Sequence, residues 1–419
     1  MHFGLFTYGS RGDVQPYIAL ALGLMNRGHQ VTLAAPQNFK DFVEGYGVAF
    51  HALHGNAEEM VYSPECMKVI KSGSNLAFVR LFVKIQHDMR YELFNTVLNG
   101  CKAVDAIIAN NVGCMQVSIA AEHLHKKILI IQLNPPAIPT STFALPGFDF
   151  INHPWYNKLT YRVMERVVWR MAKPDLIEFR QLLRLPPFEQ TIFKNLTSQK
   201  IPVIHAFSEE LIERPPDWDS RYPVTGFMTI NEGDRKSNAA DTIAQDLVNW
   251  LQAGEKPVYI GFGSIPIPDP NKLSQIIQHL LTHTNHRILF CAGWSHVPHL
   301  PQHANLYVVS AVNHQWLFAQ CKTAVIHGGI GTLTAVLKAG IPPIVVSLFV
   351  DQPIWGKIIE RKKVGVHLPW RKLSAPRLVR AINETSTAAL TLQAITIGEK
   401  ISKEDGVSNA IRHIENYFL

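Results

Sequence analysis

The chain has 419 residues, of which 47% are hydrophobic and 17% charged, with a formal net charge of +7 and a pI near 9.1. A single core stops growing at roughly 250–300 residues, so the length predicts two or three domains of ordinary globular composition. The basic excess favours phosphate-bearing ligands or anionic surfaces, but no basic stripe or nucleic-acid-binding motif is present. We therefore expect no nucleic-acid partner.

The five cysteines show no C-x-x-C spacing and their number is odd, which indicates reduced thiols rather than a disulfide framework or a zinc site. The chain opens without a basic-then-apolar signal segment, and no run of 18 apolar residues predicts a membrane-spanning helix. We expect a cytoplasmic protein. The basic excess leaves transient, peripheral contact with an anionic membrane surface open, and the oligomeric state is undetermined.

In the N-terminal half, short apolar strands alternate with helical patterns. Residues 2–8 predict a strand, residues 9–13 a glycine turn, and the residues up to Gly28 a helix. Further strands are predicted at 30–35, 48–52, 106–109, 128–132, 203–207 and 222–225, and helical regions at 76–98 and 155–185. This alternation predicts a parallel sheet built from β-α-β units.

The polar segment 231–240 separates this half from a second one with the same rhythm. Strands are predicted there at 258–262, 287–291, 306–309, 323–326 and 343–346, and a final helix at 406–417. The chain is therefore predicted to be α/β, with an N-terminal domain at 1–228, a linker at 229–245, a C-terminal domain at 246–405 and a C-terminal helix at 406–419.

The sequence HGGIGT at residues 327–332 follows a predicted strand and opens a helix. A helix N-terminus exposes unpaired N–H groups, and glycines let a phosphate approach them closely. Asp351 and Gln352 follow the next strand, at the sheet edge where open α/β sheets bind ligands. A carboxylate and an amide together can bind sugar hydroxyls, so the combination is more specific than the glycine turn alone.

Four segments of the C-terminal half carry a family resemblance: PVYIGFGS at 257–264, VNHQWLF at 312–318, HGGIGT at 327–332 and DQP at 351–353. They resemble the donor half of GT-B-fold glycosyltransferases of the UDP-glycosyltransferase superfamily. The N-terminal GSRGDVQP at 9–16 is similar to the sterol glucosyltransferase and glycopeptide-antibiotic glycosyltransferase branches. The resemblance implies two Rossmann-like parallel-sheet domains that face a deep interdomain cleft.

The resemblance also implies donor-binding roles. Diphosphate contacts would come from Ser10, Arg11, Ser264, His327, Gly329, Gly331 and Thr332, the nucleobase would meet Val312, and the sugar would meet Asp351 and Gln352. Plant members carry a Trp that stacks on uracil where this chain has Ala311. The nucleobase of the donor is therefore left open, so the donor is either a UDP-sugar or a TDP-sugar, with UDP-glucose favoured.

Sugar transfer to a hydroxyl needs a general base, and Asp13 stands where plant members carry a catalytic His. The Asp that orients this His in plant members is replaced here by Asn110, which agrees with a carboxylate base that has no tautomer to fix. We predict inverting displacement with Asp13 as the base. The alternative is that Asp13 only caps the following helix.

The N-terminal half is expected to bind a lipophilic acceptor, such as a sterol, terpenoid, polyketide, flavonoid or carotenoid-like molecule. Candidate lining residues are Phe78, Phe82, Pro136, Phe143, Phe148 and Trp155, although for any one of them packing in an ordinary aromatic core is the more frequent role. No close histidine pair has a partner at metal-ligand spacing, so we expect no metal site and no cofactor beyond the nucleotide sugar.

The predicted activity is transfer of a hexose, with glucose favoured, to a hydroxyl of such an acceptor. The alternative enzymes are a GT-B sugar-nucleotide epimerase and a cell-wall lipid glycosyltransferase, and the motif at 10–16 argues against both. A further alternative is a catalytically weak protein that binds nucleotide sugar or lipid, and the combination of Asp13, His327, Asp351 and Gln352 argues against it.

Overall fold

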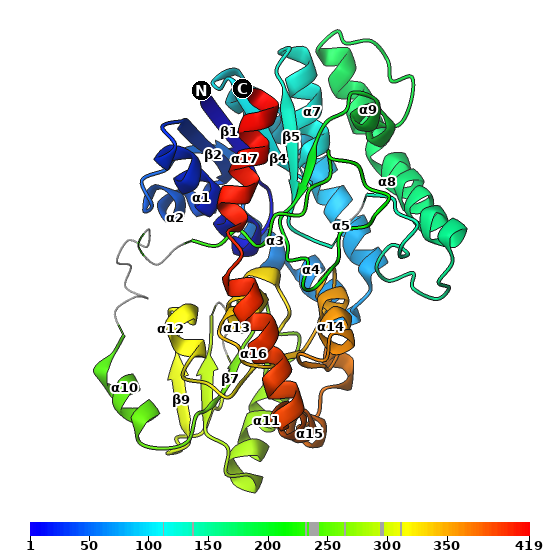
Figure 1. Ribbon diagram of the computed structural model, residues 1–419. Helices are drawn as coiled ribbons and strands as arrows, with labels where there is room; N and C mark the ends of the chain where they lie inside the picture. The colour runs from blue at the N-terminus through cyan, green and yellow to red at the C-terminus, as the bar shows by residue number, and fades with distance from the viewer. Residues whose placement is uncertain are drawn as a thin grey trace. The chain divides into compact units, whose positions relative to one another are not determined.

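The computed structural model describes residues 1–111, 113–135, 138–230, 233, 243–263, 265–293, 297–310 and 312–419 (Figure 1). The chain forms two compact units, of which the first comprises Met1–Ala57, Val79–Arg235 and Glu404–Leu419. The second comprises Glu58–Phe78 and Lys236–Lys403. Within the described ranges, no helix is both long and apolar enough to cross a bilayer.

The first unit contains a parallel six-stranded sheet in the order β3-β2-β1-β4-β5-β6. Its strands are β1 His2–Phe6, β2 Gln30–Pro36, β3 Ala49–Leu53, β4 Ala106–Asn110, β5 Ile128–Gln132 and β6 Val203–His205. Parallel sheets are covered on both faces, so their strands read as continuous apolar runs. Every residue of β4 and β5 is buried, which fits this rule.

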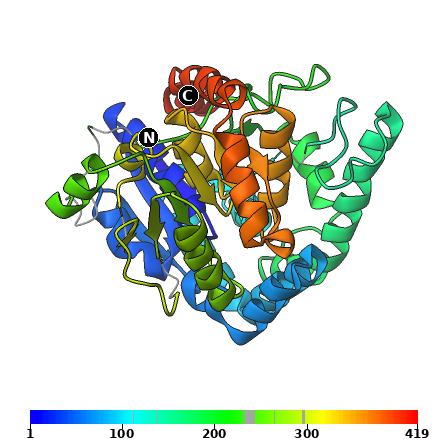
Figure 2. The same cartoon turned by 90° about the horizontal axis from the view of Figure 1, so that it is seen from below.

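Helices cover both faces of this sheet: α1 Arg11–Asn26, α2 Lys40–Glu44, α5 Asn75–Asp88, α6 Arg90–Lys102, α7 Cys114–His123, α8 Pro154–Leu182, α9 Ile192–Ser198 and α17 Gly406–Phe418. Side chains alternate between the faces along a strand. Phe3 and Leu5 of β1 accordingly join one core cluster with α1 and α17, whereas Phe6 joins another with α6 and α7. Helix α8 runs along the outer edge of the unit in Figures 1 and 2.

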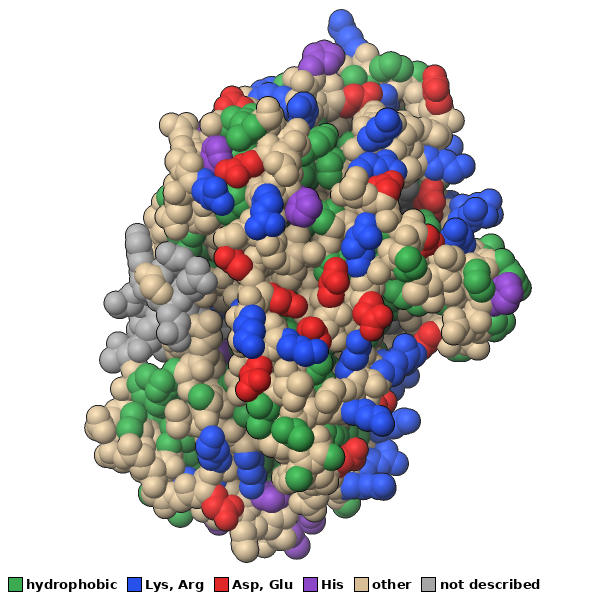
Figure 3. Space-filling model, viewed as in Figure 1, with side chains coloured by type: hydrophobic (Ala, Val, Ile, Leu, Met, Phe, Trp, Pro, Cys, Tyr) green, Lys and Arg blue, Asp and Glu red, His purple; other side chains and the backbone are tan. Residues whose placement is uncertain are grey.

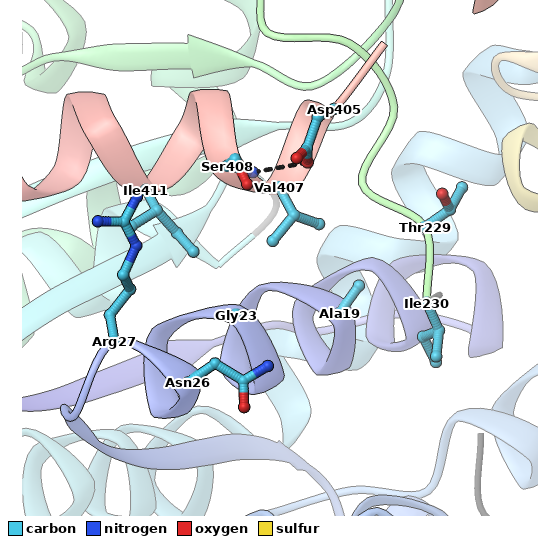
Figure 4. A pocket seen from close by; sticks show the side chains of 10 residues that line it. All are labelled: Ala19, Gly23, Asn26, Arg27, Thr229, Ile230, Asp405, Val407, Ser408 and Ile411. Atoms are coloured by element: carbon cyan, nitrogen blue, oxygen red, sulfur yellow. Dashed lines mark hydrogen bonds between the residues drawn. The ribbon is translucent and has the colours of Figure 1, made fainter. Parts of the chain in front are cut away.

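The C-terminal helix α17 packs along α1, so the two ends of the chain lie in the same unit (Figure 1). A Cβ atom at Gly23 would lie 2.5 Å from Val407 and 2.7 Å from Ile411, so only glycine allows this close packing. Beside the contact lies a cavity of about 220 Å³ whose polar lining includes Arg27 and Asp405 (Figure 4). None of the predicted site residues lines it.

The second unit contains another parallel six-stranded sheet, in the order β12-β11-β10-β7-β8-β9. Its strands are β7 Val258–Gly261, β8 Ile288–Cys291, β9 Leu306–Val309, β10 Thr323–Ile326, β11 Pro343–Val345 and β12 Val366–His367. The helices are α3 Ala57–Tyr62, α4 Pro64–Ser72, α10 Gln245–Gln252, α11 Pro270–His283, α12 His314–Phe318, α13 Ile330–Lys338, α14 Gln352–Arg361, α15 Ala375–Thr385 and α16 Ala388–Ser402.

Both sheets follow the same doubly wound strand order, 3-2-1-4-5-6 when each unit is numbered from its own first strand. In such sheets ligands bind at the carboxyl ends of the strands, where the strand order reverses. The reversal falls between β1 and β4 in the first unit and between β7 and β10 in the second. The segments after β1 and β10 are those that contain Asp13 and His327.

The prediction of an α/β fold with two parallel sheets is confirmed, and the predicted helical region 76–98 is present, but one strand prediction was wrong. The region 76–98 forms two helices, α5 and α6, separated at Met89, whose backbone leaves the helical region at φ −105° and ψ 14°. Residues 222–225 form only an isolated bridge between Val224 and His205.

Basic side chains are spread over the face shown in Figure 3, with acidic ones among them.

Candidate functional site

The turn from β1 to α1 places the Asp13 carboxylate beside the helix N-terminus. Ser10 caps α1, and the Asp13 Oδ2 atom accepts hydrogen bonds from the Ser10 backbone N–H at 2.8 Å and from its hydroxyl at 3.2 Å. Gly9 precedes the cap with φ +146°, and a Cβ atom there would lie 2.3 Å from Oδ2. Glycine is therefore required at this position, both for the backbone conformation and for the approach of the carboxylate.

Asp13 is not the N-cap of α1, as the alternative expected, because Ser10 holds that position and Asp13 is the third helical residue of a capping box. The hydrogen bonds from Ser10 occupy only one of its two carboxylate oxygens. Among the described residues, no hydrogen bond reaches Oδ1. Burial raises the pKa of Asp13 from 3.8 to about 6, against the two hydrogen bonds from Ser10, which lower it. Such a carboxylate is largely ionised at pH 7 yet basic enough to accept a proton, as a general base must be.

Asn110, at the end of β4, supports the same turn without contacting the Asp13 carboxylate. Its side-chain amide donates to the Thr7 hydroxyl and to the Tyr8 carbonyl, both at 3.2 Å. The Thr7 hydroxyl in turn donates to the Asp13 backbone carbonyl at 3.1 Å. Through these bonds the buried Asn110 holds the backbone of the turn that presents Asp13. It makes no contact that would change the charge on the Asp13 carboxylate.

Ser10 and Arg11, the other two predicted site residues of this turn, make contacts within the first unit. The Ser10 hydroxyl also accepts from the Gly12 backbone N–H at 3.3 Å, and the exposed Arg11 guanidinium lies 4.5 Å from the centre of the Phe42 ring. Their contact with a diphosphate stays a prediction.

In the second unit, the glycine-rich turn leads from β10 into α13 with its backbone N–H groups open. Gly329 is the N-cap residue and supplies no side-chain hydrogen bond, so the first N–H groups of the helix keep their anion-binding capacity. Gly331 is exposed, and a Cβ atom there would meet nothing within 4 Å, whereas Thr332 is half-buried. The N-terminus of α13 is thus open toward an anion, and phosphate binding there stays a prediction.

His327 lies buried at the start of this turn, between glycines. A Cβ atom on Gly329 would lie 2.3 Å from its Nε2 atom, and one on Gly263 would lie 3.2 Å from its Cε1 atom. Its Nδ1 atom is buried without a hydrogen-bond partner among the described residues. Burial lowers the pKa of His327 to about 4, so the ring is neutral at pH 7 and offers a hydrogen bond rather than a positive charge.

Asp351 and Gln352 open helix α14 next to the glycine turn. The Trp355 indole N–H donates to Asp351 Oδ2 at 3.1 Å, and the buried Gln352 accepts from the Leu348 N–H at 2.9 Å through Oε1. A Cβ atom on Gly328 would lie 3.5 Å from the Gln352 Cβ atom, so the structure brings the two predicted donor motifs together. Val350 precedes them in the left-handed region, at φ +57°, a strained conformation for a β-branched residue.

The remaining predicted donor residues are less defined. Val312 is half-buried in the segment before α12, whose N-terminus is capped by the Asn313 side chain. Ser264 lies outside the described residues, as does Pro136 among the predicted acceptor residues.

The aromatic residues predicted to line an acceptor pocket occupy different environments. Phe82 packs against the core cluster that contains α6 and α7, and Phe143 is half-buried. The Phe78 ring contacts the Phe349 ring in a tilted arrangement with centres 4.9 Å apart, within the second unit. Phe148 and Trp155 are exposed on the first unit. The four described members that belong to the first unit therefore range from packed against the core to exposed.

Sequence reasoning missed the residues that support the site: Gly9, Gly263, Phe349 and Trp355. Gly9 was visible as the glycine before the Ser10 cap, and the four-residue spacing of Asp351 and Trp355 places both on one helical face. The proximity of Gly263 to His327 had no local signal, because the two follow the neighbouring strands β7 and β10, which are far apart in sequence.

Family models match both halves of the chain. The glycosyltransferase family 28 N-terminal domain matches residues 3–141, and the erythromycin biosynthesis protein CIII-like C-terminal domain matches residues 282–402. The glycosyltransferase of kitacinnamycin has a similar solved structure, with a TM-score of 0.69, 17% identity and coverage of 100% of this chain and 99% of that one, which supports the fold.

Curated relatives match almost the whole chain. Sterol 3-beta-glucosyltransferase UGT80A2 of Arabidopsis thaliana is 32% identical over 98% of this chain and 65% of its own length. Sterol 3-beta-glucosyltransferase UGT80B1 of the same plant is 30% identical over 98% of this chain and 67% of its own. The chain spans only part of the curated relatives it matches, from 26% of one to 67% of another. With two doubly wound sheets and both glycine turns in place, the chain belongs to the UDP-glycosyltransferase superfamily of GT-B-fold glycosyltransferases.

Proposed function

We propose that this protein transfers a hexose, with glucose favoured, from a UDP- or TDP-sugar to a hydroxyl group of a lipophilic small molecule. The observation that carries the proposal is the Asp13 carboxylate, with one oxygen held by Ser10, the other without a partner among the described residues, and a pKa of about 6. The names of the relatives favour a sterol or a similarly shaped alcohol as the acceptor.

The second unit supplies the donor half of the reaction. The open N–H groups of α13 and the neutral His327 ring bind the diphosphate, and stabilise the charge that develops as it leaves. Asp351, held by Trp355, and Gln352 bind the sugar hydroxyls. Val312 meets the nucleobase through its backbone.

The chemical step is a single displacement. Asp13 takes the proton from the acceptor hydroxyl while the oxygen forms a bond to the anomeric carbon. The bond between that carbon and the diphosphate oxygen breaks, and the nucleoside diphosphate leaves with the electron pair. One direct attack on the face opposite the leaving group inverts the anomeric configuration. The protein's residues provide the proton acceptor and the charge stabilisation, so no metal enters the proposed step.

A donor and acceptor panel tests the activity. UDP-glucose, TDP-glucose and UDP-GlcNAc are each combined with sterols, hydroxylated terpenoids and flavonoids, and mass spectrometry detects the added hexose. Asp13→Asn should lower kcat by about 10²–10⁴-fold with little change in donor affinity, because it removes the base and keeps the side-chain shape. Binding of a nucleotide sugar without transfer or hydrolysis would instead favour a non-catalytic protein.

Asp405→Asn is a matched control, because Asp405 also caps a helix through its carboxylate. Its Oδ1 atom accepts from the Ser408 N–H at 3.0 Å at the start of α17, and Asp405 is exposed (Figure 4). This variant should transfer sugar at the wild-type rate. If both variants lost turnover equally, the loss would reflect helix capping, and Asp13 would not be the base.

A further inference from the structure

Helix α8 carries a row of apolar side chains on the surface of the first unit. Trp155, Leu159, Val163 and Val167 follow one another at intervals of four residues and are 41–59% exposed. Residues four apart lie above one another on a helix, so these side chains form a continuous line. Just before α8, Phe150 is 80% exposed and Ile151 50% exposed. Contiguous exposed apolar surface of this kind marks an interaction site.

A second row on α8 is basic and lies beside the first. Its members are Lys158, Arg162, Arg166 and Arg170, each three residues after a member of the apolar row and each exposed. Lys158 lies 3.7 Å from the Asp217 carboxylate. Within the described parts of the chain, no carboxylate pairs with Arg162, Arg166 or Arg170. These three charges are thus left for a partner.

The opposite face of α8 holds the helix in place. Asn157, Tyr161, Leu176 and Phe179 are buried, and Phe179 stacks on Phe94 of α6 with ring centres 4.1 Å apart. Because this face is packed, the orientation of the two exposed rows is set by the fold. Figures 1 and 2 both show α8 at the outer edge of the first unit.

We propose that α8 and residues 148–151 rest on an anionic lipid surface. An amphipathic helix with Lys and Arg on its polar side and Trp, Phe or Leu on its apolar side lies in the interface of a bilayer. Basic residues near such a surface are attracted to anionic headgroups. A second copy of this chain is a poorer partner, because two basic rows would repel each other. The binding would bring the enzyme to a lipophilic acceptor, but it requires neither donor nor acceptor.

Co-sedimentation with lipid vesicles tests the proposal. The protein is mixed with vesicles of phosphatidylcholine containing 30% phosphatidylserine, or with pure phosphatidylcholine vesicles, at low and high salt. We expect binding to the anionic vesicles that weakens as salt rises, and weaker binding to the neutral ones. Arg162→Ala combined with Arg166→Ala should weaken binding to the anionic vesicles about thirtyfold. Each basic residue near such a surface contributes about 1 kcal/mol, which is about a fivefold change in affinity, and two residues are removed. Trp155→Ala with Leu159→Ala should also weaken it.

The matched control is Arg377→Ala combined with Arg380→Ala, which removes the same charge from exposed positions on α15. This pair should bind vesicles like the wild type. Equal losses in the two arginine pairs would show that overall charge, rather than α8, drives binding. Absence of wild-type binding to anionic vesicles at low salt would also overturn the proposal. Neither result bears on sugar transfer, which is measured separately with a soluble acceptor.

Discussion

Replacing Asp13 by Asn should stabilise the protein at neutral pH while it lowers kcat. The folded state raises the pKa of Asp13 from 3.8 to about 6, mainly through burial. This rise corresponds to about 3 kcal/mol of unfavourable free energy when the carboxylate is charged. Asn has the same shape and can still accept the Ser10 N–H hydrogen bond, but it carries no charge to desolvate.

The pH dependence follows from the direction of the pKa shift. Below pH 3.8 the Asp13 side chain is protonated in both the folded and the unfolded state, so its charge costs nothing. Between pH 3.8 and about 6 the unfolded state ionises first, so stability is lost as pH rises. Above about pH 6 the cost is constant. The free energy of unfolding of Asp13→Asn should therefore exceed that of the wild type by an amount that grows between pH 3.8 and about 6. The difference should then level off, at about 3 kcal/mol or less.

Thermal unfolding of wild type and Asp13→Asn at several pH values between 4 and 8 measures this effect. The melting temperature of the variant should exceed that of the wild type by several degrees at pH 8, and the two should converge near pH 4. The control variant Asp405→Asn removes an exposed carboxylate that caps a helix, so it shows how much the loss of such a cap alone changes the melting temperature. A difference that does not change with pH, or a variant less stable at pH 8, would refute the burial argument for Asp13.

Three other predictions concern the donor half-site. His327→Ala should weaken UDP-glucose binding, measured by calorimetry, about ten- to hundredfold. The loss should be the same at pH 6 and pH 8, because the wild-type ring with its pKa of about 4 is neutral at both. A loss that differs between these pH values would imply a charged ring. Gly329→Ala should lower the melting temperature because its Cβ atom would lie 2.3 Å from His327, whereas Gly331→Ala, with nothing within 4 Å, should keep or raise it; equal effects would contradict the crowding. Trp355→Phe removes the 3.1 Å hydrogen bond to Asp351 and should raise the donor KM more than it lowers kcat, and an unchanged KM would show that Asp351 needs no such support.

Local sequence was sufficient to predict the elements that carry the site. The apolar runs of β4 and β5 and the glycines at 328 and 329 depend on residues within a few positions of one another. Such short-range patterns are what sequence reading detects well. The same holds for the placement of Asp13 and His327 after strands, because a turn that follows a buried strand is visible in the sequence itself.

The tertiary structure decided which of these residues are buried, charged or exposed. The raised pKa of Asp13 and the lowered pKa of His327 arise from burial, which depends on how the elements pack together. Phe82 and Trp155 looked alike in sequence, yet the first packs on a core and the second lies on the surface. Local composition cannot separate them, because burial depends on which elements pack together. The strand orders and the return of α17 to α1 are likewise set by contacts between distant parts of the chain.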